Sequence, residues 1–145
     1  MNAQDETKEK KTALIWAAER GHQNIVAVLV ADSRVDLNAK DGIKEKTALI
    51  WAAEKGFDKV ASVLIANSRV DVNARDNIGR TALIWAAING KVKVIDMLQN
   101  HPQIDANIKD QYFYTALHRG VFANNERTVS SLVNFSSSSI GKSKF

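Results

Sequence analysis

The sequence predicts an all-α solenoid of about four helix–turn–helix units with projecting β-turn fingers. The segment Thr-Ala-Leu-Ile-Trp-Ala-Ala occurs three times without change, starting at Thr12, Thr47 and Thr81. A fourth copy starts at Thr115 and departs after three residues. The threonines are 35, 34 and 34 residues apart, which is the length of one supersecondary unit. A fixed period in this range is typical of a stacked repeat array rather than of a single globular core.

The first complete unit, residues 12–46, shows how each element is predicted. Thr12 is suited to cap the first helix, because its hydroxyl can accept a hydrogen bond from a first-turn amide. Gly21 can adopt the left-handed conformation that ends a helix. A second helix is expected at residues 22–31, with an apolar set of Ile25, Val26, Val28, Leu29 and Val30. Residues 35–38 form a short extended segment before the next turn.

The other units, residues 47–80, 81–114 and 115–135, repeat this plan. Gly56 and Gly90 end their first helices, and Asn124 takes the glycine position in the last unit. The connecting turns are residues 41–46, 76–80 and 110–114. Residues 1–11 match part of a unit and are expected to form a partial N-terminal finger, so the repeat domain spans residues 1–135. The serine-rich residues 136–145 are expected to be a flexible tail.

The composition narrows the classes of function. With 45% hydrophobic residues among 145, the chain can build a packed core, and the absence of cysteine excludes thiolate metal sites and cysteine nucleophiles. The net charge of +4 includes two lysines of the tail, so the body suits an acidic patch on a partner better than a DNA backbone. No apolar run is long enough for a membrane span. The polar N-terminus does not resemble a signal peptide, which favours the cytoplasm, with secretion by another route as the alternative.

These motifs resemble the ankyrin repeat family. Its Thr-Pro-Leu-His-x-Ala-Ala motif appears as Thr-Ala-Leu-Ile-Trp-Ala-Ala, and its Asp-Val-Asn-Ala motif appears at residues 36–39 and 71–74. Its Asp-x-x-Gly-x-Thr turn appears at residues 76–81. The chain departs from the pattern in its isoleucines at the usual histidine position, which only His118 keeps. Alanine after threonine and a bulky residue before the alanine pair look more like bacterial than vertebrate members.

The resemblance implies an L-shaped stack and a function. Ankyrin repeat proteins are usually non-catalytic scaffolds that bind protein partners with the fingertips and first helices, which line a concave face. The same is therefore expected here, for a monomer without cofactors. An alternative is that the chain is the recognition module of a larger effector or regulatory protein. Nucleic-acid binding is a weaker hypothesis, because Glu19, Glu45 and Glu54 interrupt any basic stripe.

The tryptophan of each copy has two compatible interpretations. It lies about 150° from the centre of the Leu-Ala-Ala face on a helical wheel. Trp16, Trp51 and Trp85 would therefore form a row along the stacked first helices. Each indole either packs against the neighbouring unit as framework or presents an edge to a partner, since tryptophan is enriched at binding hot spots.

The other candidate contacts lie beside this row and at the fingertips. Those at the ends of the first helices match positions that vary between ankyrin repeats and often touch ligand: Glu19, Arg20, Glu54, Lys55, Ile88 and Asn89. Those at the fingertips are Ile43, Lys44, Lys46, Ile78, Arg80, Tyr112 and Tyr114. Arg119 takes the tryptophan position of the last unit. The alternative for each is a solvated helix end, or local packing for the two tyrosines.

The remaining polar side chains favour structural roles. Three aspartates and three asparagines recur before the turns and can bond to local backbone groups: Asp36, Asp71, Asp105, Asn38, Asn73 and Asn107. The three histidines occupy different positions in their units and have no metal-ligand spacing. We therefore expect no metal site and no catalytic residues. His118 is expected to bond back to Thr115.

Overall fold

The computed structural model describes residues 11–143, and residues 135–143 by their backbone only. The partial finger predicted at the N-terminus lies almost wholly outside the described residues. The first helices of the four units are α2 (Ala13–Glu19), α4 (Ala48–Lys55), α6 (Ala82–Ile88) and α8 (Ala116–Phe122). The second helices are α3 (Gln23–Val30), α5 (Asp58–Ile65), α7 (Val92–Gln99) and α9 (Glu126–Ser143). No strand occurs within residues 11–143.

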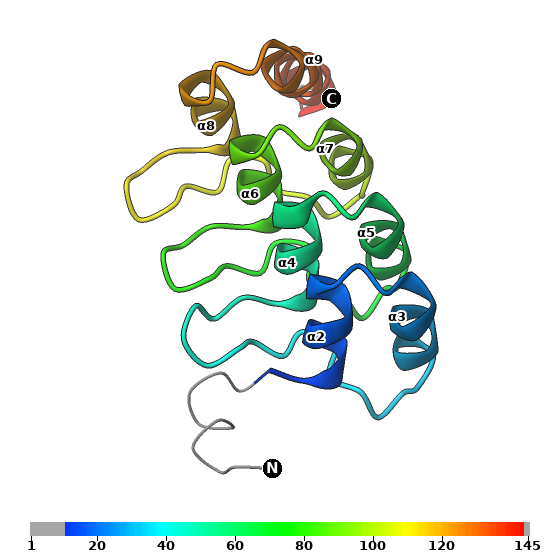
Figure 1. Ribbon diagram of the computed structural model, residues 1–145. Helices are drawn as coiled ribbons and strands as arrows, with labels where there is room; N and C mark the ends of the chain where they lie inside the picture. The colour runs from blue at the N-terminus through cyan, green and yellow to red at the C-terminus, as the bar shows by residue number, and fades with distance from the viewer. Residues whose placement is uncertain (1–10, 144–145) are drawn as a thin grey trace.

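The helices form two layers, and the fingers form a third. In Figure 1 the first helices stack in the middle column, the second helices stack to the right, and the fingers project to the left. Each first helix contacts the first helix of the next unit, and the same holds for the second helices. The predicted repeat stack is therefore confirmed, and the fingers project from one side of the helices (Figure 1).

Each first helix begins at a threonine, as predicted. The side chains of Thr12, Thr47 and Thr81 each accept a hydrogen bond of 3.2 Å from the amide three residues later. The fourth unit adds a reciprocal bond, because Nδ1 of His118 accepts from the backbone amide of Thr115 at 3.1 Å. The predicted bond from His118 back to Thr115 is thus confirmed, and it completes a capping box.

The first helices end in the left-handed conformation. Gly21, Gly56 and Gly90 have φ angles of +74°, +75° and +68°, and Asn124 has +53°. Asparagine is one of the few residues with a side chain that adopts this conformation readily, because it can bond to its own backbone. The predicted helix ends, including the asparagine in the glycine position, are therefore confirmed.

The core lies between the layers, and it takes in only part of the apolar set predicted for the second helix of the first unit. Val60 and Leu64 of α5 are fully buried, because α5 has a neighbouring helix on each side. Among the described helices, α3 has a second-helix neighbour, α5, on one side only. Of the five apolar residues in its set, Val26 is buried and Leu29 and Val30 pack half-buried against the core, whereas Ile25 and Val28 are 54% and 72% exposed.

The recurring asparagines connect successive units. The Asn38 side chain donates to the carbonyl of Arg69 at 2.8 Å and accepts from the amide of Asp71 at 2.7 Å. Asn73 makes the same pair of bonds to the third unit. The aspartates bond to local backbone amides as predicted, at Asp36, Asp71 and Asp105. Asn38 and Asn73 are structural too, but they bond to the backbone of the following unit rather than locally. The segment 35–38, however, is not extended throughout: it turns at residues 37–38, where Asp36 accepts from the amide of Asn38 at 3.0 Å.

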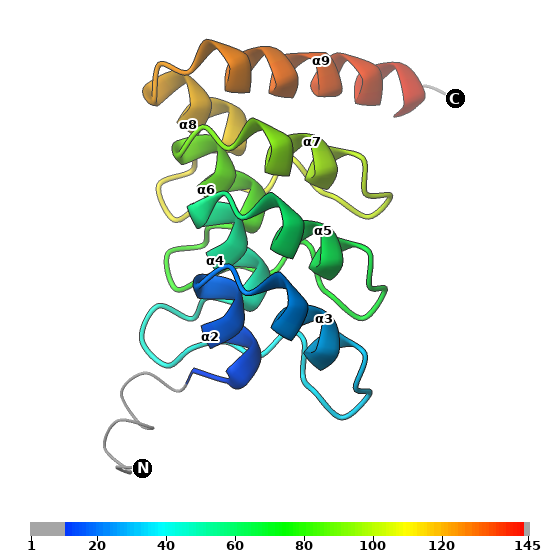
Figure 2. The ribbon, with the colours of Figure 1, turned by 45° about the vertical axis from the view of Figure 1, so that its right-hand side comes forward.

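The last helix is longer than the sequence suggests. We predicted that it ends near Asn134 and that residues 136–145 form a flexible tail. In the structure α9 continues to Ser143 and crosses the end of the stack (Figure 2). No proline interrupts this segment, and serine costs a helix only about 0.5 kcal/mol per residue relative to alanine. A serine-rich composition alone therefore does not end a helix.

The fingers repeat one strained backbone position. Glu45, Gly79 and Phe113 each lie two residues before a capping threonine, and their φ angles are +56°, +76° and +68°. This conformation costs a residue with a side chain about 1–2 kcal/mol, and it costs glycine almost nothing. Two of the three fingers therefore keep a bulky residue where glycine would fit best.

We predict that Glu45→Gly raises the free energy of unfolding by about 0.5 kcal/mol, because relief of the left-handed strain exceeds the entropy cost of glycine. The side chain of Glu45 is exposed, so little packing is lost. Urea unfolding followed by circular dichroism measures the change. Gly79→Ala is the matched reverse and should destabilise the chain, because a φ of +76° strains a residue with a Cβ and that Cβ would lie 3.1 Å from the backbone nitrogen of Gln111. A less stable Glu45→Gly variant would contradict this account.

Candidate functional site

A buried aspartate organises the base of each finger. Asp41, Asp76 and Asp110 are at most 6% exposed. In the second finger, Oδ1 of Asp76 accepts from the amides of Ile78 and Arg80 at 3.1 and 2.9 Å. The backbone of the finger closes over this carboxylate through a 2.9 Å bond from the Asp76 amide to the Arg80 carbonyl. One oxygen of each aspartate thus fixes the shape of its finger.

The other aspartate oxygen holds the side chain in the tryptophan position of the first helix. Nε1 of Trp51 donates to Asp41 at 2.8 Å, and Nε1 of Trp85 donates to Asp76 at 2.7 Å. In the fourth unit Arg119 replaces tryptophan and donates to Asp110 from Nε and Nη2, at 2.9 and 2.6 Å. The sequence analysis missed these aspartates, although each stands nine or ten residues before the side chain it binds.

Cations fill the spaces between the indoles. The residue before each of the first three threonines is basic, and its head group lies beside tryptophan rings. These cations and indoles form what we call the cation–indole ladder: Lys11, Trp16, Lys46, Trp51, Arg80 and Trp85. Nζ of Lys46 lies 4.6 Å from the ring centroid of Trp51 and 4.0 Å from that of Trp85. Such contacts stabilise by about 0.5–2 kcal/mol each, more when water is excluded.

Ion pairs on the first helices compensate this positive charge. Lys46 is 2% exposed, and its Nζ lies 2.9 Å from Oε2 of Glu54. Lys11 pairs with Glu19 at the same distance. In the third unit Ile88 stands where these glutamates stand. The two glutamates, which we predicted as candidate contacts, thus hold the cations of the ladder in place.

The three tryptophans differ in their exposure. Trp51 is 7% exposed, Trp85 is half-buried, and Trp16, in the first unit, is 39% exposed. The packing interpretation therefore describes Trp51, while Trp16 presents an edge to solvent. The exposed fraction differs because Trp51 and Trp85 lie between cations and helices of two units. A row of three equally exposed tryptophans is not what the chain forms.

The other predicted contacts fall into three groups. Those that the structure leaves exposed are Arg20, Ile43, Lys44, Lys55, Asn89, Tyr112 and Tyr114. Those that are half-buried are Glu19, Glu54, Ile78, Arg80, Ile88 and Arg119. Lys46, predicted as a fingertip residue, is buried inside the ladder, because Trp85 of the following unit covers it. In this conformation neither Lys46 nor Trp51 offers more than a trace of surface to a partner.

An aromatic patch lies at the other end of the same face. It consists of four exposed side chains of the third finger and the end of α8, namely Tyr112, Phe113, Tyr114 and Phe122. The rings of Tyr114 and Phe122 pack edge to face, with centroids 4.8 Å apart. The guanidinium of Arg119 lies 4.9 Å from the ring of Tyr114 and 5.9 Å from that of Phe122. Arg119 thus links this patch to the buried Asp110.

Hydrogen bonds stabilise the ionised form of the Asp110 carboxylate. Burial by itself would raise the pKa of this carboxyl. Hydrogen bonds from Arg119 and from the amides of Tyr114 and Tyr112 outweigh burial, and the pKa lies below the ordinary value of 3.8. Arg80 approaches the same oxygen, with Nε at 3.3 Å. The carboxylate therefore remains ionised and ties two arginines together.

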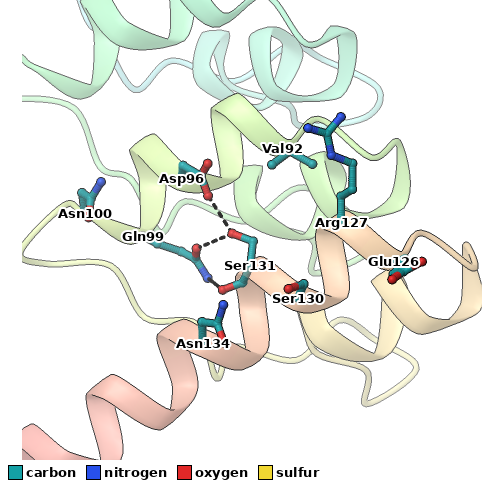
Figure 3. Close-up of a pocket in the computed structure, with 9 residues that line it drawn as sticks. All are labelled: Val92, Asp96, Gln99, Asn100, Glu126, Arg127, Ser130, Ser131 and Asn134. Atoms are coloured by element: carbon teal, nitrogen blue, oxygen red, sulfur yellow. Dashed lines mark hydrogen bonds between the residues drawn. The ribbon is translucent and has the colours of Figure 1, made fainter.

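One pocket lies away from the fingers, between two second helices. It is an open groove of about 780 Å³ between α7 and α9, shown in Figure 3. Oγ of Ser131 donates to Asp96 at 2.6 Å and also lies 3.0 Å from Oε1 of Gln99. Its nine lining residues include no histidine, cysteine or lysine, so a nucleophile–base pair of the usual kind is not assembled there. A smaller pocket of about 270 Å³ lies on the concave side, between α2 and the first finger.

Among residues 11–143, no group of three or more histidine, aspartate or glutamate side chains is placed to hold a metal ion. Within the same residues, no helix is both long and apolar enough to cross a membrane.

Comparison with known proteins identifies the class. The family model for ankyrin repeats (3 copies) matches residues 1–76 and 68–142. The chain therefore belongs to the ankyrin repeat family, as its motifs predicted. No curated protein matches the chain. Ankyrin repeats are protein-interaction modules and are typically non-catalytic. The exposed aromatic patch is the kind of surface that such a module uses.

We predict that Lys46→Met lowers the free energy of unfolding by about 2 kcal/mol, because it removes the cation between two indoles and leaves Glu54 without its partner. Urea unfolding measures this loss. Lys11→Met is the matched comparison at the outer end of the ladder, where a smaller loss of about 1 kcal/mol is expected, because the Lys11 side chain is 14% exposed and that of Lys46 only 3%. Equal losses in the two variants would show that burial within the ladder is not what matters.

We predict that Asp110→Asn destabilises the chain by about 1–3 kcal/mol near neutral pH. The lowered pKa makes this stabilisation complete above the unfolded value of 3.8, and it is lost as the pH falls through the folded pKa. The difference between wild type and variant should therefore shrink below about pH 4. Urea unfolding over a pH series measures it. The same series in an Arg119→Gln background should show a smaller dependence, and an unchanged one would refute the assignment.

Proposed function

We propose that this chain is a non-catalytic scaffold that binds a protein partner through its concave face. By concave face we mean the fingers together with the exposed side of the first helices α2, α4, α6 and α8. The observation that carries the proposal is the aromatic patch, four aromatic side chains left in solvent on the third finger and α8. Exposed aromatic clusters of this kind mark interaction surfaces, since leaving them in water is unfavourable.

The ladder supports the proposal by making the face rigid. Its indoles Trp51 and Trp85 donate to the buried aspartates at the finger bases, and its Lys46 pairs with Glu54 of α4. These contacts fix the first helices relative to the fingers. Neighbouring fingers are also joined directly, since the Asn77 amide donates to the Lys44 carbonyl at 3.0 Å. A surface that is ordered before binding loses less conformational entropy on association. Trp16 and the aromatic patch are then two anchors presented on one preorganised support.

A capture experiment tests this proposal. The immobilised chain is exposed to a native lysate, and retained proteins are quantified for wild type, for Trp16→Ala/Tyr112→Ala, and for a control. The control, Lys59→Glu/Lys93→Glu, changes exposed residues of the second helices α5 and α7. Circular dichroism first verifies that all three chains are folded. Both substitutions of the test variant affect exposed side chains, so folding should be preserved.

We predict that a genuine partner is retained by wild type and by the control, and is reduced about ten-fold or more by Trp16→Ala/Tyr112→Ala. The partner is then purified and its affinity for the three chains is measured directly. Partners that bind all three chains equally would show that the concave face is not the binding surface. Loss with the control alone would place binding on the second helices instead.

A further inference from the structure

The small pocket beside the first finger is where the concave face carries uncompensated charge. It has a volume of about 270 Å³ and is lined by Lys11, Glu19, Asp41, Ile43, Lys44 and Trp51. Its two carboxylates are already engaged. Glu19 pairs with Lys11 at 2.9 Å, and Oδ2 of Asp41 accepts from Trp51 at 2.8 Å. The charge of Glu19 is therefore offset by Lys11, whereas the buried Asp41 keeps its charge and is satisfied by hydrogen bonds from Trp51 and from the backbone amide of Lys46.

The lysines around the pocket are not neutralised in this way. Lys44 and Lys55 are exposed, with Nζ atoms 5.8 and 6.0 Å from the ring centroid of Trp51. Neither forms an ion pair with any residue from 11 to 134. Arg20, which lies 5.1 Å from the Trp16 ring, is likewise exposed and outside these ion pairs. Lys44 thus lines the pocket, Lys55 and Arg20 lie beside the rings of Trp51 and Trp16, and none of the three is paired with a carboxylate from the described part of the chain.

The opposite end of the face differs. There Arg80 and Arg119 are half-buried and both bond to the buried carboxylate of Asp110, which offsets one of their two charges. The exposed patch at that end is aromatic. Exposed cations outside the ion pairs, Arg20, Lys44 and Lys55, lie near the first finger instead, and the aromatic surface lies near the third.

We propose that the pocket beside the first finger receives the carboxylate of an aspartate or glutamate from an extended acidic segment of the partner. An apolar side chain of the same segment then packs on Ile43 and the open edge of Trp16, which are both exposed. This inference rests on the proposed function, because it assumes that the concave face binds a protein, and it adds the chemistry of that protein. Complementary charge gives specificity and speeds association.

An acidic peptide fits this site better than a nucleic acid, although both carry negative charge. The ring of Trp51 is buried and already contacted by ammonium groups, so no base can stack on it. Stacking platforms with free faces are the usual basis of single-strand binding. The exposed Glu45 of the same finger would also repel a continuous phosphate backbone, whereas a peptide can place its few carboxylates to avoid it.

The test uses fluorescent peptides of repeated Glu-Ser-Leu-Ser sequence, measured by fluorescence anisotropy on the full chain. In an extended peptide alternate side chains face the same way, so this sequence presents glutamate and leucine to one surface. The matched probe is Gln-Ser-Leu-Ser, which differs only in charge. A single-stranded oligothymidine is the nucleic-acid probe. Each titration is repeated at low and high salt, because charge pairing at an exposed rim weakens with salt.

We expect the glutamate probe to bind wild type at least about ten-fold more tightly than the glutamine probe. The Lys44→Glu/Lys55→Glu variant should lose that preference, and Lys44→Gln/Lys55→Gln should lose part of it, which covers the case in which charge reversal disturbs folding. Lys59→Glu/Lys93→Glu carries the same charge change on the second helices and should keep the preference.

Four outcomes would overturn the inference. They are equal binding of both peptides, no binding of either, an equal loss in the second-helix control, or tighter binding of the oligonucleotide. The proposed function can be judged separately. A partner that is lost with Trp16→Ala/Tyr112→Ala but is unaffected by the Lys44 and Lys55 reversals would sustain the scaffold proposal and refute the acidic segment. A partner unaffected by every concave variant would refute both.

Discussion

The structure depends on a carboxylate that is removed from water at the base of each finger. A buried carboxylate is tolerated only where hydrogen bonds replace its lost hydration. Asp41, Asp76 and Asp110 meet this condition with donors from two elements, the finger backbone and the first helix. Because both elements must donate to the same group, the finger cannot tilt relative to its helix without leaving a buried charge unsatisfied. The L-shape of each unit follows from this constraint.

The same constraint explains the residues in the tryptophan position. The position needs a side chain long enough to reach the finger base with a donor at its end. Tryptophan supplies one N–H, and Arg119 supplies two to Asp110. The flat indoles then leave spaces between successive units, which the basic residues before each threonine fill. Indoles alone would give each buried carboxylate one hydrogen bond and no compensating charge. The cations that lie between the indoles also offset the negative charge of the carboxylates.

Sequence reasoning succeeded where the decisive contacts are local. The capping threonines, the left-handed helix ends and the bond of His118 to Thr115 involve neighbours within a few residues, so a short motif contains both partners. It failed where a side chain is buried by another unit. Lys46 resembles an exposed fingertip residue in its own segment, but Trp85 of the next unit covers it. Ile25 resembles its buried counterpart Val60, but α3 begins the layer of second helices. The regular offset from each aspartate to its tryptophan was a readable signal, since a recurring polar–aromatic pair suggests a bond.

The repeat also determines which parts of the face are free to recognise a partner. A ladder residue in the middle of the stack is surrounded by donors, cations and carboxylates from two units. Its polar groups are therefore already satisfied, and it exposes little surface. Trp51 and Lys46 are in this situation. Exposed side chains are left where the sequence departs from its own repeat, at Phe113, and where the row of tryptophans begins, at Trp16. This favours recognition by two chemically different ends, one cationic and one aromatic, joined by a rigid middle. A partner that reads both ends must match their separation, so the ladder would contribute to specificity without itself being touched.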